Sequence, residues 1–147
     1  MKDLIEYYQT IENSLNDLGL HAVHCRGTEE GNWSVEFNQQ KIHIDCWKVI
    51  PQQPLIQFMS ILMITSNEYT HALYAKLLEL NKELVGASFC VSGNKILLKQ
   101  TSLIHEFSTE WFKKEFMNYC KYLYTLSEEL SDAFPNNKKP GTSPILP

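Results

Sequence analysis

The sequence predicts an α+β domain in which helices pack against an antiparallel sheet. Short segments alternate apolar and polar residues, and three longer segments repeat apolar residues every three or four positions. Read in order, they predict helix, three strands, helix, two strands, helix. The 147 residues suit a single domain, predicted over 1–134. The remaining residues, 135–147, are rich in Pro, Gly, Asn and Ser and predict a disordered tail.

The first helix is expected over residues 3–19. Asp3 can cap its N-terminus, apolar residues recur with a helical period, and Gly19 can end it. A short strand is expected next, at 22–25, and the sequence leaves open whether this strand joins the sheet.

Two alternating segments, 33–37 and 41–47, predict an antiparallel pair. A four-residue loop over 38–41 would place Phe37 opposite Ile42 and keep the apolar side chains of both strands on one face.

Residues 55–64 are apolar at both odd and even positions, which is typical of a central strand covered on both faces. A buried helix is the alternative. The preceding Pro54, the three isoleucines and the ten-residue length favour the strand.

The second half of the chain predicts a helix, a hairpin and a long final helix. Residues 65–68 have the spacing of a capping box, and Gly86 can end the helix that follows. Gly93 and Asn94 form a two-residue turn signal, so that Val91 faces Ile96 and Phe89 faces Leu98. Ser108 or Thr109 can cap the last helix, expected over 109–134.

The net charge and the distribution of apolar residues limit the kinds of partner and the cellular compartment that we expect. The net charge of −4 argues against nucleic acid or an anionic membrane as the main partner. No apolar run reaches the roughly 20 residues that a membrane helix needs. Acidic residues also occupy the start of the chain, where a signal peptide would have its apolar core. We therefore expect a cytoplasmic protein with reduced thiols.

The histidines and cysteines suggest an alternative function, a small-molecule or metal-dependent enzyme using His43, Asp45 and Cys46. Zinc binds His nitrogen and Cys thiolate, and the pair His21 and His24 invites the same hypothesis. Residues three apart on a strand point to opposite faces, so only His43 and Asp45 would share a face. No cofactor is therefore expected.

The aromatic and apolar residues predict a contact surface instead. Trp47 and several tyrosines lie at outward positions, and the strand 55–64 is apolar on both sides. A partner or a second copy of the chain could use such a surface, and we predict Trp47, Phe58 and Leu62 as its residues. The alternative is that helices cover one face and the remaining apolar residues are ordinary surface scatter.

One stretch carries a family resemblance. The helix ending Leu77-Leu78-Glu79-Leu80-Asn81 leads into Gly86–Thr101, a short strand, a glycine turn and a second strand. With the predicted element order and the strand at 33–37, this resembles the YbjN family of bacterial sensory-transduction-regulator domains, which have a type III secretion chaperone-like fold. Asn81 matches the motif and has two candidate roles, binding and capping of the helix C-terminus.

The resemblance implies a protein without enzymatic activity. Secretion chaperones are small acidic homodimers that hold an extended segment of a client protein, and YbjN-like proteins are associated with stress responses and motility. The leading hypothesis is therefore a non-enzymatic protein-binding module, chaperone-like or regulatory, that pairs with itself and binds a client or regulatory protein. A third possibility is a structural subunit of a larger complex.

Overall fold

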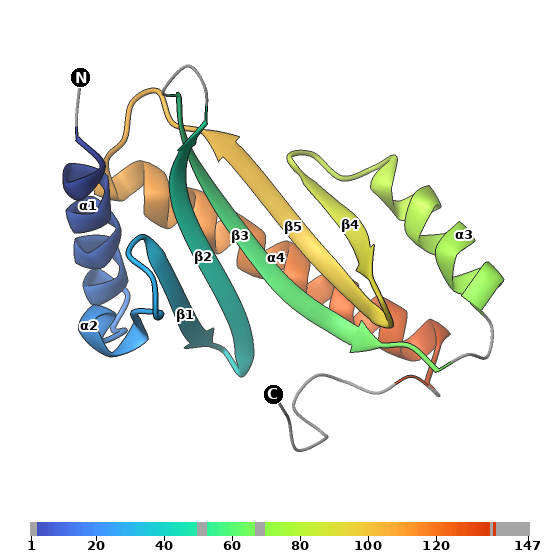
Figure 1. Ribbon diagram of the computed structural model, residues 1–147. Helices are drawn as coiled ribbons and strands as arrows, with labels where there is room; N and C mark the ends of the chain where they lie inside the picture. The colour runs from blue at the N-terminus through green and yellow to red at the C-terminus, as the bar shows by residue number, and fades with distance from the viewer. Residues whose placement is uncertain (1–2, 50–52, 67–69, 136, 138–147) are drawn as a thin grey trace.

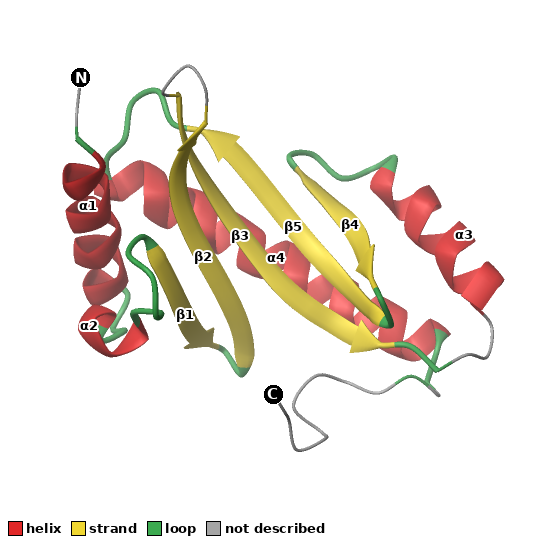
Figure 2. Cartoon of the chain, in the orientation of Figure 1, coloured by secondary structure: helices red, strands yellow, loops and turns green. Residues whose placement is uncertain are grey.

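The computed structural model describes residues 3–49, 53–66, 70–135 and 137 as one antiparallel sheet with helices on one side (Figures 1 and 2). The strand order is β1-β2-β3-β5-β4. The predicted α+β class and element order are confirmed. The elements are α1 Leu4–Asp17, α2 Ala22–Cys25, β1 Asn32–Phe37, β2 Gln40–Val49, β3 Gln53–Ile64, α3 Thr70–Asn81, β4 Ala87–Ser92, β5 Lys95–Leu103 and α4 Thr109–Ala133.

Helix α4 forms the layer behind the sheet, and α1 and α3 lie toward its two edges (Figure 1). Figure 1 shows α4 crossing behind the central strands, with α1 at the β1 side and α3 at the β4 side. The core lies between this layer and the inward side chains of the strands. From α4 it receives a stripe at helical spacing: Phe112, Phe116, Tyr119, Leu123, Leu126 and Leu130. Ion pairs join the flanking helices to α4, Lys113 with Asp17 of α1 and Lys76 of α3 with Glu129.

The predicted caps of the outer helices are confirmed. The Asp3 carboxylate accepts a hydrogen bond from the Leu4 backbone N–H at 2.7 Å. The Ser108 hydroxyl accepts one from the Trp111 N–H at 3.1 Å. The capping box expected at 65–68 lies partly outside the described residues, as does most of the tail at 135–147. Among the described residues, no helix is long and apolar enough to cross a membrane.

The short strand expected at 22–25 is wrong, because these residues form the helical turn α2. The Asn16 side chain accepts a hydrogen bond from the Ala22 N–H at 3.0 Å and holds the start of the turn against α1. Ala22 itself is buried in the core. The helical turn brings the rings of His21 and His24 to 5.8 Å, whereas a strand would have separated them.

The first hairpin has a tighter turn than the four-residue loop predicted at 38–41. Asn38 and Gln39 alone form the turn, both with positive φ (52° and 67°), as a type I′ turn requires. Val35 therefore pairs with Ile42, where the predicted register paired Phe37 with Ile42. Because the error is two residues, the apolar side chains still share one face.

The second hairpin has the predicted register. Val91 pairs with Ile96 and Phe89 with Leu98, around the turn at Gly93, whose φ is +60°. The alternating pattern on both strands left one register that buries the apolar residues, and the glycine turn fixed its position.

Strand β3 is central, as predicted, and it lies between β2 and β5. It is not covered on both faces. Its even-numbered residues from 54 to 62 are buried toward α4, and its odd-numbered residues from 53 to 61 are only half-buried on the other side. The second apolar face of this strand therefore remains available for contact.

Candidate functional site

The candidate site is the side of the sheet turned away from α4, which we call the open face. Figure 1 shows β2, β3 and β5 in front of α4, with no described helix in front of them. Side chains alternate along each strand, so the residues between the buried ones belong to this face. Its composition can be read from the register of the three central strands.

Two rows of apolar side chains cross the open face. Trp47, Leu55 and Leu103 are cross-strand partners and form the first row. Leu103 is 50% exposed. Ile61 and Leu97 are partners in the second row, which continues to Cys90 on β4. The rows lie six positions apart along β3, from Leu55 to Ile61, which is about 20 Å for an extended chain.

The rows between them are mostly polar. The Thr101 hydroxyl donates to the Gln57 side-chain oxygen at 3.1 Å. The His43 ring is 2.8 Å from the Ser34 hydroxyl on β1. Burial lowers the pKa of His43, with the Asp45 carboxylate opposing that effect, and burial raises the pKa of Asp45. The open face therefore combines a polar centre, which contains these two hydrogen bonds, with apolar ends.

The predicted contact residues divide between the open face and the core. Trp47 lies half-buried on the open face, within the first apolar row. Phe58 and Leu62 point the other way and are buried among the core residues. The sequence alone could not separate them, because the strand is apolar at both parities.

The residues of the enzyme alternative do not converge. His43 and Asp45 share the open face, whereas Cys46 is buried on the helix side. Burial raises the pKa of the Cys46 thiol to about 12, so it is a poor nucleophile and a poor thiolate ligand. Within the described residues there is no group of three or more His, Cys, Asp or Glu side chains that could hold a metal ion.

The two edges of the sheet differ. At the β4 edge, the Asn81 side-chain oxygen accepts a hydrogen bond from the Phe89 N–H at 2.7 Å, and its nitrogen donates to the Phe89 carbonyl at 3.5 Å. The amide thus replaces the peptide group of a neighbouring strand, which is neither of the roles considered from the sequence. At the β1 edge, Arg26 forms one antiparallel bridge to Trp33, and no described strand pairs with the rest of that edge.

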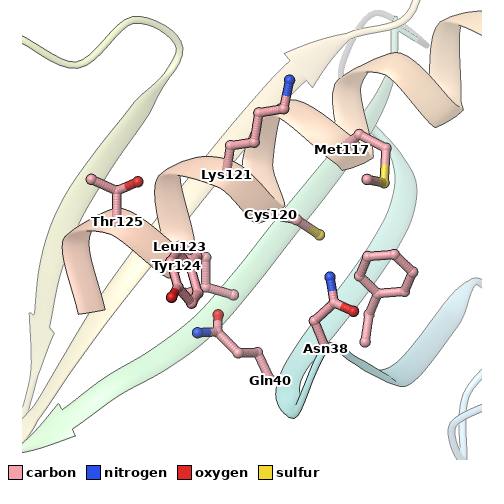
Figure 3. A pocket seen from close by; sticks show the side chains of 9 residues that line it. Asn38, Gln40, Met117, Cys120, Lys121, Leu123, Tyr124 and Thr125 are labelled. Carbon is pink, nitrogen blue, oxygen red and sulfur yellow. The ribbon is translucent and has the colours of Figure 1, made fainter. Parts of the chain in front are cut away.

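A small pocket lies on the helix side, between the first hairpin and α4 (Figure 3). Its volume is about 250 Å³, and its lining includes Phe37, Met117 and Leu123. Asn38, Gln40 and Thr125 add polar side chains to this lining, and Figure 3 shows Lys121 extending away from the hairpin. Burial raises the pKa of Cys120, at its wall, to about 12. The lining residues include no pair of groups suited to acid–base chemistry.

No protein-family model matches the sequence, and no curated protein matches it. Solved structures do match the fold. The crystal structure of YbjN, a proposed transcription regulator from E. coli, aligns with a TM-score of 0.55 and 16% identity over 85% of this chain and 90% of that chain. A chain of the HopA1-SchA chaperone–effector complex aligns with a TM-score of 0.61 and 12% identity over 87% of this chain and 99% of that chain.

The chain has the fold of YbjN and the secretion chaperones. The resemblance read from the sequence is therefore confirmed at the level of fold. At these identities the likeness concerns architecture, and function has to be argued from the surface of this chain.

Sequence reasoning missed most of the open face. Leu55, Leu97 and Leu103 join Trp47 there only because β3 pairs with both β2 and β5. The signal that could have found them was outward parity in neighbouring strands. Using it required the long-range pairing of β3 with β5, which no local pattern encodes.

Proposed function

We propose that this chain is a non-enzymatic protein-binding module, chaperone-like or regulatory, carried by one domain over residues 1–134. The observation that carries the proposal is the open face, whose two apolar rows are covered by no described element. Two rows of apolar side chains rimmed by polar residues, left uncovered on a folded chain, are typical of protein contacts. The structural neighbours agree in kind: one is a proposed regulator, and the other comes from a chaperone–effector complex.

We place the module in the cytoplasm. Cys25, Cys46, Cys90 and Cys120 are all free thiols, as expected in a reducing compartment.

The proposed module is a homodimer that pairs through its α3 side. Leu78 on α3 is 71% exposed, and Val85, which follows the helix, is 78% exposed. Val91 of the adjacent β4 is also exposed. Pairing here would bury apolar surface and leave the open face for a client.

Light scattering after size exclusion, across a concentration series, tests the pairing. We expect a mass of twice 17.1 kDa for the native chain. The double variant Leu78→Gln, Val85→Gln should give a monomer, and Ile5→Gln, an exposed apolar residue on α1, should leave the dimer unchanged. A native monomer at every concentration would refute the dimer.

Affinity capture from the source cells tests client binding. The native chain should retain a protein at a fixed ratio, and the open-face variant Leu55→Thr, Leu103→Thr should lose it. Ile5→Gln with Val23→Gln is the matched control, because both residues are exposed apolar positions on α1 and α2. Equal capture by the open-face variant and the native chain would rule out the open face as the binding surface.

A further inference from the structure

The open face carries lysines that have no acidic neighbour on its β5 side. Lys99 lies between Met59 of β3 and Ser88 of β4 in the register. Lys95 lies four residues before Lys99 on the same strand, opposite Ser92. Ion pairs among the described residues join Arg26, Lys76 and Lys113 to acids, and neither β5 lysine takes part in one. A positive strip therefore flanks the second apolar row on a chain whose net charge is −4.

We infer that the segment held on the open face is an amphipathic helix of another protein with an acidic flank. This inference rests on the proposed function and names the chemistry of the partner. The apolar side of the helix would cover the two rows at Trp47 and Leu97, and its carboxylates would face Lys95 and Lys99. Charge complementarity of this kind fixes orientation and speeds encounter.

A helix suits this surface better than an extended segment. The backbone groups of β2, β3 and β5 are already used in the sheet ladder, so a strand laid on the face would find no hydrogen-bond partners there. A helix satisfies its own backbone. The opposite side of the same sheet already accepts one, α4, through Phe112 and Phe116. The distance of about 20 Å between the rows corresponds to about 13 helical residues.

A second copy of the chain fits the open face less well. A second copy would bring its own two unpaired lysines to the contact, whereas an acidic helix would bring carboxylates that complement Lys95 and Lys99.

Two synthetic helical peptides of about 18 residues provide the test. Both carry the same leucine stripe, and one has glutamate on the flank where the other has lysine. Binding to the full-length chain is measured by fluorescence anisotropy. We expect the glutamate peptide to bind about tenfold more tightly at low salt, as a few exposed charge pairs allow. The charge-reversed chain Lys95→Glu, Lys99→Glu should prefer the lysine peptide.

The open-face variant Leu55→Thr, Leu103→Thr separates the two levels of the argument, and its urea midpoint verifies that it folds. It should bind neither peptide. If both peptides bound the native chain with equal affinity and neither bound the open-face variant, the acidic partner would be refuted. The open face would still be the binding surface. Unchanged binding of both peptides to the open-face variant, or no binding to the native chain, would overturn the inference. If the solution mass of the native chain rose with protein concentration in the absence of peptide, and the mass of the open-face variant did not, the open face would bind a second copy of the chain instead.

Discussion

Phe58, which the sequence suggested as a contact residue, lies in the core, and its burial allows a quantitative prediction. The side chain is 1% exposed, and its ring lies 5.4–5.7 Å from the rings of Phe112, Phe116 and Tyr119. Phe58→Ala removes these contacts and leaves a cavity, which should lower the free energy of unfolding by about 3–5 kcal/mol. The melting temperature should fall by about 10–16 °C.

The neighbouring residue provides the control. Met59 lies half-buried on the open face, so Met59→Ala should cost only about 1 kcal/mol, within the range of strand propensity effects. Urea unfolding followed by circular dichroism measures both variants, with equal m-values as the check on two-state behaviour. If Phe58→Ala unfolded at the native midpoint, the orientation assigned to β3 would be wrong, and with it the residues assigned to the open face.

Three further predictions concern single contacts. Asn81→Ala should lower the free energy of unfolding by about 1–2 kcal/mol in urea, because the N–H and carbonyl of Phe89 lose their partner. A change below about 0.5 kcal/mol, the usual range for surface substitutions, would contradict the closed edge. Gly31→Ala should lower the free energy of unfolding far more than Gly93→Ala in the same assay. Both glycines have positive φ, so the backbone strain is similar. An added Cβ at Gly31 would lie 2.8 Å from a backbone carbonyl oxygen and from a tyrosine hydroxyl, whereas at Gly93 it would meet nothing within 4 Å. The hydrogen bond from Arg26 lowers the pKa of Glu12. The stabilisation from the Glu12 carboxylate is therefore present above the ordinary pKa of Glu and is lost as the pH falls through the lowered pKa. Glu12→Gln should reduce the difference in the free energy of unfolding between pH 7 and pH 3, and an unaltered pH profile would refute this role.

Local patterns predicted the fold well where each pattern admitted one solution. The hairpin at 87–103 has alternating strands and a glycine turn, and its register was predicted correctly. The predicted register of the first hairpin is wrong by two residues, because Asn38 and Gln39 both adopt positive φ and no glycine in the sequence indicates such a turn. The prediction of a strand at 22–25 is wrong because the helical turn there is held by the Asn16 side chain, which lies outside the segment.

The candidate site was harder to predict than the fold. Parity identified Trp47 as an outward residue but gave no answer for Phe58 and Leu62, since β3 is apolar on both sides. Which side α4 covers depends on how a helix more than 40 positions later packs, and the two apolar rows depend on the pairing of β3 with β5. These are properties of the assembled sheet.

The closure of one sheet edge by Asn81 also limits how copies of the chain can add to one another. A sheet with two free edges can grow without end, as fibres do, because each added copy offers a new edge. Here α3 and the Asn81 amide occupy the β4 end, so any edge-to-edge pairing must use β1 in both molecules. Such pairing stops at two copies. Strand addition at the sheet edges alone therefore cannot propagate from copy to copy.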